Sequence, residues 1–111
     1  MKIISIAFDV DGTLINEDGK TNWRITDLLR TLASFKNTRI IVWSGGGKSY
    51  AEMTVRHLGL EEYVDTCADK NHTGLDDDGK HIFTPGFAPD IAIDDIQACE
   101  LGLINLIVRE K

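Results

Sequence analysis

The chain has 111 residues, 42% of them hydrophobic and 27% charged, and its 12 Lys and Arg against 18 Asp and Glu give a net charge of -6. This length and composition predict one small globular domain, residues 1–111, and exclude an intrinsically disordered chain. The acidic balance argues against broad, sequence-independent binding of nucleic acid, which needs a Lys- and Arg-rich face. The sequence shows neither an apolar run long enough to span a membrane nor a signal-peptide pattern, so we expect a cytoplasmic protein with no membrane partner.

Five short apolar runs, rich in Ile and Val, predict strands that are covered on both faces, as in a parallel sheet. In chain order these runs are residues 3–8, 39–43, 63–67, 91–93 and 104–108. Apolar residues at helical spacing predict helices over residues 23–35 and 48–58, and Asp95 can cap a third, short helix that ends at Gly102. The alternation of strand and helix predicts a three-layer α/β/α, Rossmann-like domain with a mainly parallel five-stranded sheet.

Two segments depart from this alternation. Residues 71–90 hold both prolines and little apolar periodicity, which predicts a long loop or a small hairpin. The pair Asp18-Gly19 predicts a tight turn soon after the first strand. The two cysteines, Cys67 and Cys99, lack the spacing of metal ligands, and we interpret both as buried thiols.

Polar residues follow four of the predicted strands. In strand order they are Asp9 and Asp11, then Ser44 with the Gly-rich turn 45–47, then Lys70, then Asp94 and Asp95. Ligands of an open α/β sheet bind beyond the carboxyl ends of its strands, so we expect these residues to share one site. Clustered carboxylates need a compensating cation, and oxygen ligands without His or Cys favour Mg²⁺. The Gly-rich turn before a helix favours an anion. Together these features predict a site for a metal ion and a phosphoryl group.

The Asp-Val-Asp-Gly-Thr sequence at residues 9–13, after an apolar strand, resembles the first motif of the haloacid dehalogenase superfamily. Ser44, Lys70 and the pair Asp94-Asp95 fall in the order of that family's second, third and fourth motifs, so the resemblance covers nearly the whole chain. Two Asp residues two positions apart are similar to the phosphatase and phosphotransferase branch. The resemblance implies a Mg²⁺-dependent phosphomonoester hydrolase that acts through an aspartyl-phosphate intermediate.

The resemblance also implies the catalytic and metal-binding roles. Asp9 would be the nucleophile that attacks phosphorus. Asp11 would protonate the leaving oxygen and then accept a proton from the attacking water. The Asp9 carboxylate, the Asp11 main-chain carbonyl and Asp94 would hold Mg²⁺.

A further group of residues would bind the phosphate by the same resemblance: Gly12, Thr13, Ser44, Gly45 and Lys70. The helix that usually follows the family's lysine is not evident in the sequence, so Lys48 or Lys80 could serve in place of Lys70. Asp95 would orient Lys70 or a metal-bound water, or would only cap the following helix. Of the three histidines, only His72 is near enough to Lys70 in the sequence to touch a substrate.

The spacing of the motifs predicts a capless member of the superfamily. A turn and one helix fill residues 9–39, and residues 70–94 leave room for a loop, so neither usual insertion point can hold a cap domain. An open site has to be shielded by a large substrate, a partner chain or homo-oligomerisation. The substrate would be a phosphorylated small molecule or a macromolecular end.

Two alternatives to a small-molecule phosphatase remain open at this stage. The first is a polynucleotide-end (3′-phosphate) phosphatase, which the acidic charge does not favour. The second is a non-catalytic module, either a haloacid dehalogenase fold or a receiver-like domain, that only binds phosphate. The intact Asp9 and Asp11 pair counts against this second alternative.

Overall fold

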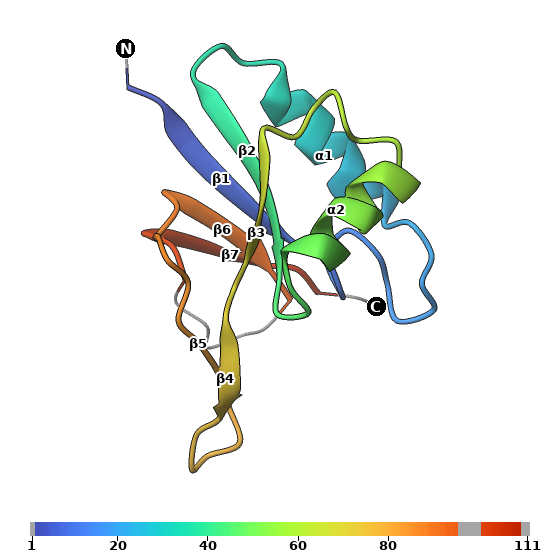
Figure 1. Ribbon diagram of the computed structural model, residues 1–111. Helices are drawn as coiled ribbons and strands as arrows, with labels where there is room; N and C mark the ends of the chain where they lie inside the picture. The colour runs from blue at the N-terminus through green and yellow to red at the C-terminus, as the bar shows by residue number, and fades with distance from the viewer. Residues whose placement is uncertain (1, 96–100, 110–111) are drawn as a thin grey trace.

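A computed structural model describes residues 2–95 and 101–109 of the chain (Figure 1). In chain order its elements are β1 (Ile4–Asp9), α1 (Trp23–Ala33), β2 (Thr38–Ser44), α2 (Lys48–His57), β3 (Thr66–Asp69), β4 (His72–Leu75), β5 (His81–Phe83), β6 (Ile91–Asp94) and β7 (Ile104–Ile107). Five strands form a parallel sheet in the order β3-β2-β1-β6-β7, and β4 pairs with β5 in a separate antiparallel hairpin. The predicted Rossmann-like domain with a five-stranded parallel sheet is confirmed.

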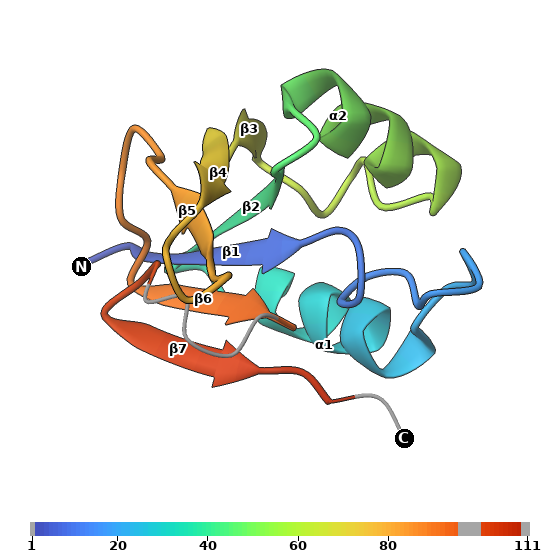
Figure 2. The ribbon, with the colours of Figure 1, turned by 90° about the horizontal axis from the view of Figure 1, so that it is seen from below.

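The strand order reverses at β1, the central strand of the sheet. The chain first steps from β1 outward through β2 to β3 and then returns to the other side of β1 as β6 and β7, as Figure 2 shows. In open α/β sheets ligands bind at such a reversal, beyond the carboxyl ends of the strands. Here this point lies at the ends of β1 and β6, where Asp9 and Asp94 stand.

One face of the sheet carries the larger part of the core. Ile6 and Phe8 of β1 and Val42 of β2 are fully or almost fully buried on this face, where Leu29 of α1 and Val55 of α2 pack against them. Both helices lie on this face because successive crossovers that step in the same direction place their helices on the same side of the sheet. Alternate residues of each strand point to the opposite face.

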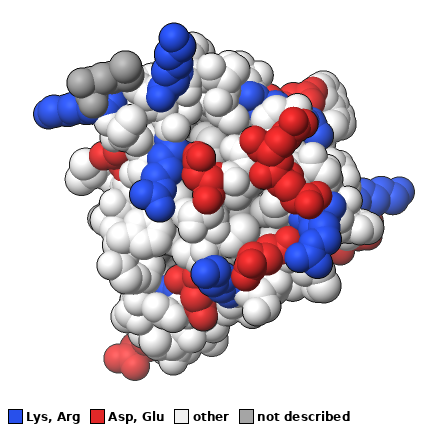
Figure 3. All heavy atoms as spheres, turned by 45° about the horizontal axis from the view of Figure 1, so that its top comes forward, with Lys and Arg blue, Asp and Glu red and all other residues white. Residues whose placement is uncertain are grey.

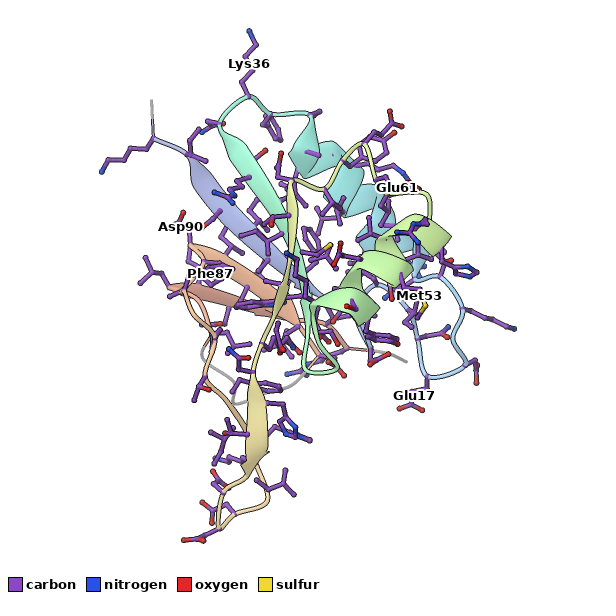
Figure 4. The ribbon with its side chains drawn as sticks, viewed as in Figure 1. Glu17, Lys36, Met53, Glu61, Phe87 and Asp90 are labelled. Carbon is purple, nitrogen blue, oxygen red and sulfur yellow. The ribbon has the colours of Figure 1, made fainter. Side chains whose placement is uncertain are left out.

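The opposite face is covered differently. Ile41 and Trp43 of β2 pack there with Phe83, and the Trp43 ring packs against Phe87 in a tilted arrangement, with 5.4 Å between ring centroids. Phe87 comes from the segment between β5 and β6 (Figure 4). Within residues 2–95 and 101–109 no helix covers this face, and residues 96–100 of the third helix predicted between Asp95 and Gly102 lie outside the described residues. In the described chain, aromatic and apolar side chains from irregular segments take the place of the outer helical layer.

The remaining structural predictions concern the hairpin, the turn after the first strand, the start of the third strand and the cysteines. The alternative of a hairpin within residues 71–90 is confirmed by β4 and β5. The Asp18-Gly19 turn is confirmed, with Gly19 at a φ of 74°. The third strand begins at Thr66, later than predicted, because residues 60–64 first form a turn after α2. Cys67 is a free thiol, but it is half-buried rather than buried as predicted, because it lies on β3 at the edge of the sheet. Cys99 lies outside the described residues.

Neither cap insertion point holds a domain in the described part of the chain. Residues 10–22, between β1 and α1, form a compact turn, and residues 70–90, between β3 and β6, form the β4–β5 hairpin and a short connection. None of the described helices is long and apolar enough to cross a membrane. On the face of the molecule shown in Figure 3, basic and acidic side chains are interspersed, with no continuous basic strip.

Candidate active site

A buried lysine joins two carboxylates at the strand-order reversal. The Lys70 ammonium donates hydrogen bonds to Asp9 Oδ1 at 2.7 Å and to Asp94 Oδ2 at 2.6 Å. The Lys70 residue is only 1% exposed, and such burial of a charge is tolerated only where opposite charges and hydrogen bonds compensate it. Of the three candidate lysines, Lys48 and Lys80 are exposed, and Lys70 is the one that contacts the buried carboxylates.

The protonation of this cluster follows from its burial. Burial and the neighbouring Asp94 carboxylate raise the pKa of Asp9 from 3.8 to about 8, although Lys70 acts in the opposite direction. Burial lowers the pKa of Lys70, but Asp9 and Asp94 together raise it above its ordinary value, so Lys70 stays an ammonium. Thr13 is fully buried and donates its hydroxyl to Asp9 Oδ2 at 3.4 Å.

The raised pKa of Asp9 predicts a pH dependence of stability in the metal-free protein. Between about pH 4 and pH 8 the folded state holds a proton on Asp9 that the unfolded chain has already released. The free energy of unfolding should therefore fall as the pH rises through this range, with a contribution from Asp9 of up to about 1.4 kcal/mol per pH unit. Urea unfolding in EDTA measures this slope, and Asp9→Asn should flatten it. An identical slope in both proteins would contradict the assignment.

Three carboxylates form a group that could hold a metal ion. One oxygen from each of Asp9, Asp94 and Asp95 lies within 4.8 Å of the other two. Burial and the hydrogen bond with Asp94 raise the pKa of Asp95, as expected for carboxylates that lack sufficient positive charge. The donors are all carboxylate oxygens, which suit a hard divalent cation better than a thiolate- or imidazole-seeking metal. The group therefore fits a divalent metal ion, whose positive charge would supplement that of the Lys70 ammonium.

Asp11 is held apart from this buried group. Its side chain is exposed, and the Tyr50 hydroxyl donates a hydrogen bond of 2.7 Å to Asp11 Oδ1. This hydrogen bond and partial burial raise the pKa of Tyr50 to about 12. Sequence reasoning missed Tyr50, because helical periodicity assigned it only to packing. The position of Tyr50 in the first turn of α2, directly after the Gly-rich turn, is the feature of the sequence that could have identified it as a residue of the site.

The Gly-rich turn lies between β2 and α2. Ser44, at the end of β2, is buried, and its Oγ accepts a hydrogen bond of 3.0 Å from the Gly46 N–H. Gly47, the residue before α2, has a φ of 108°, a conformation that favours glycine. The turn thus brings Ser44 and the first backbone N–H groups of α2 to the same sheet edge as Asp9.

Gly12 makes a close approach to the metal-binding group. Its φ is 80°, and a Cβ built on it would overlap the Asp95 carboxylate. The Gly12 N–H donates to the Ile15 carbonyl at 2.7 Å, so its predicted role as a phosphate donor would require this bond to open. The structure brings Asp9, Thr13, Ser44, Lys70 and the pair Asp94-Asp95 to one sheet edge. Their functional roles, with those of Asp11, Gly12 and Gly45, stay predictions.

The Gly12→Ala substitution should destabilise the protein more than Gly19→Ala. Both glycines have positive φ values, 80° and 74°, so both substitutions introduce backbone strain of about 1 to 2 kcal/mol. A Cβ on Gly12 would also clash with Asp95, whereas no atom lies within 4 Å of a Cβ on Gly19. Urea unfolding should show an additional loss of about 1 kcal/mol or more for Gly12→Ala. Equal losses in the two variants would rule out the close approach to Asp95.

Comparisons with known proteins agree with this arrangement. Searches among curated proteins and among solved structures returned no match. Residues 6–108 match the family described as haloacid dehalogenase-like hydrolase. This match runs from within β1 to the residue after β7, so it includes all of the parallel sheet except the first two residues of β1, and every residue of the site. The chain belongs to the haloacid dehalogenase-like hydrolases.

Proposed function

We propose that the protein is a Mg²⁺-dependent phosphomonoester hydrolase in which Asp9 is the nucleophile. The observation that carries this proposal is the buried group in which Lys70 bridges Asp9 and Asp94, with Asp95 beside them. One ammonium does not offset three ionised carboxylates, so the metal-free protein keeps a proton on Asp9 at neutral pH, and a divalent cation would favour the ionised Asp9 that the attack needs. Membership of a hydrolase family supports hydrolysis, and the combination of lysine, cation site and Gly-rich turn supports a phosphate ester as the substrate.

Asp9 is suited to attack phosphorus because its carboxylate lies beside a cationic group, the Lys70 ammonium. In the proposed reaction one Asp9 oxygen forms a bond to phosphorus while the bond to the ester oxygen breaks, which gives an acyl phosphate and an alcohol. Lys70 favours the ionised form of Asp9 and would also bind an oxygen of the phosphoryl group. Mg²⁺, held by Asp9 and Asp94 together with Asp95 or the main-chain carbonyl of Asp11, would neutralise the negative charge of the phosphoryl oxygens.

Asp11 is suited to act as the general acid and the general base of the reaction. Its exposed position separates it from the buried carboxylates, so it can reach a leaving group that extends toward solvent. In the first step Asp11 would donate a proton to the ester oxygen, and in the second it would accept one from the water that hydrolyses the acyl phosphate. Tyr50 fixes one Asp11 oxygen by the 2.7 Å hydrogen bond and is a positioning residue.

The requirement for metal tests this proposal. With a generic aryl phosphate, the protein should turn over in Mg²⁺ and lose at least about a hundredfold in rate after EDTA treatment. Readdition of Mg²⁺ should restore the rate, which controls for damage by the chelator. A rate that is the same with Mg²⁺ and with EDTA, or no hydrolysis of any phosphate ester in Mg²⁺, would overturn the proposed function.

A further inference from the structure

The β4–β5 hairpin is fixed to the edge of the sheet that carries the site. Lys70 lies between β3 and β4, and its backbone N–H donates to the Ser44 carbonyl at 3.0 Å. At the base of the hairpin the Thr84 N–H donates to the Asn71 carbonyl at 3.0 Å, and Asn71 Nδ2 donates to the Thr84 carbonyl at 3.1 Å. The hairpin extends from this base away from the sheet (Figure 1). Residues at its base are thus held at the mouth of the proposed active site.

Three rings gather at this base, and we refer to His72, His81 and Phe83 as the ring cluster. The His72 centroid lies 4.9 Å from that of His81 and 5.1 Å from that of Phe83. The His81 and Phe83 rings are stacked, with 6.1 Å between centroids. Both histidines are exposed, and Phe83 is half-buried. The cluster therefore presents aromatic surface to solvent.

The ring cluster borders the residues that would hold the phosphate. The Lys70 ammonium lies 4.8 Å from the centroid of the Phe83 ring. A Cβ built on Gly45 would lie 3.1 Å from Phe83 Cε1 and 3.4 Å from the His72 Cβ. On the other side of the Gly-rich turn, a Cβ on Gly46 would lie 3.3 Å from Tyr50 Cδ2. A phosphate held by Gly45 and Lys70 would thus have its ester group beside aromatic side chains.

The charges around the ring cluster favour a ring over a second anionic group. His81 Nδ1 and His72 Nε2 are 2.9 Å apart, a hydrogen bond in which one ring donates and the other accepts, so these ring nitrogens are already engaged with each other. Two nearby carboxylates, Asp69 beside Gly47 and Asp76 in the hairpin turn, add negative charge to this end of the molecule. These carboxylates disfavour a second phosphate or carboxylate beside the ring cluster.

We propose that the ring cluster binds a planar aromatic or heteroaromatic ring in the leaving group of the substrate. The ring would stack on the exposed faces of His72 and His81, since aromatic pairs with centroids 4.5 to 7 Å apart attract beyond simple apolar burial. The placement of the phosphate beside the cluster rests on the proposed function. The chemical class is a phosphomonoester that carries the ring in its leaving group, either a phenyl-type ring bonded to the ester oxygen or the base of a nucleotide, which the sugar separates from it.

Binding of two phosphonates that cannot be hydrolysed tests this proposal. In Mg²⁺, the unmodified protein should bind phenylphosphonate at least about fivefold more tightly than methylphosphonate in calorimetry. His81→Leu and Phe83→Leu keep apolar surface but remove a ring, and each should lose most of this preference while binding methylphosphonate within about twofold of the unmodified protein. Ile82→Ala is the matched control, because alternation along β5 directs Ile82 away from the cluster.

Turnover distinguishes the two sources of the ring and separates this inference from the proposed function. A fall in kcat/KM in His81→Leu that is larger for phenyl phosphate than for thymidine 5′-monophosphate would assign a phenyl-type ring, and the reverse would assign a nucleobase, with glycerol 2-phosphate as the ringless reference whose kcat/KM should not change. A phenylphosphonate preference without any turnover would overturn the proposed function and leave the ring site standing. Equal affinity for the two phosphonates, or a preference that survives both ring substitutions, would overturn the ring site.

Discussion

Replacing Asp9 with Asn should abolish hydrolysis of phosphate esters and leave the fold intact. Asn has nearly the shape of Asp, but its amide cannot attack phosphorus, so the rate in Mg²⁺ should fall at least about a thousandfold. The loss should appear in kcat with an aryl phosphate as the substrate. Circular dichroism and urea unfolding would verify that Asn at this buried position, 5% exposed in the native protein, is tolerated.

An Asp outside the site provides the matched control for this substitution. Asp27, an exposed residue of α1 paired with Arg30, should tolerate Asp27→Asn without loss of activity. Equal rates for Asp9→Asn and the unmodified protein would show that Asp9 is not the nucleophile. A similar loss in Asp27→Asn would point to a general effect of the substitution on the protein.

Replacing Lys70 with Met should cost both activity and stability. Met has a similar length but no charge, so Asp9 and Asp94 would lose the ammonium that now lies between them at 2.7 and 2.6 Å. Breaking a buried ion pair from one side typically costs about 3 to 5 kcal/mol, and we expect a loss of this size in metal-free protein above pH 8. The loss should be smaller below pH 8, where the folded protein holds a proton on Asp9.

Metal dependence makes the Lys70 prediction specific. A divalent cation would replace part of the missing charge, so Mg²⁺ should raise the free energy of unfolding more in Lys70→Met than in the unmodified protein. Urea unfolding with and without Mg²⁺ measures the difference. Lys80→Met, at an exposed position in the hairpin, should change neither stability nor rate. Unchanged stability in Lys70→Met would refute the role of Lys70 as the central counter-charge.

Much of the sheet and its polar edge could be predicted from the sequence, because both depend on local patterns. Apolar runs of Ile and Val located all five strands of the parallel sheet, with β3 misplaced by a few residues. Asp9, Lys70 and Asp94 could then be predicted to share one edge, because the carboxyl ends of parallel strands in one sheet lie on the same side. Gly12 followed from the first motif, and its positive φ gives a physical reason for glycine there.

The features that escaped prediction depend on tertiary contacts. Tyr50 was assigned to packing, and only the approach of α2 to Asp11 shows its hydrogen bond. The bridging of two carboxylates by Lys70 depends on how far its side chain reaches from the end of β3 to Asp9 and Asp94, which sequence spacing does not encode. The ring cluster requires the cross-strand register of β4 and β5, including the irregularity between His72 and Gly74.

In the proposed mechanism the phosphoryl group is covalently bonded to Asp9 before water releases it as phosphate. Rapid acid quenching of the protein during turnover of a ³²P-labelled phosphate ester in Mg²⁺ measures this most directly. We predict protein-bound label that hydroxylamine releases, as it does from an acyl phosphate, and that is absent in Asp9→Asn. Turnover of the ester without protein-bound label, or label that persists in Asp9→Asn, would contradict the account.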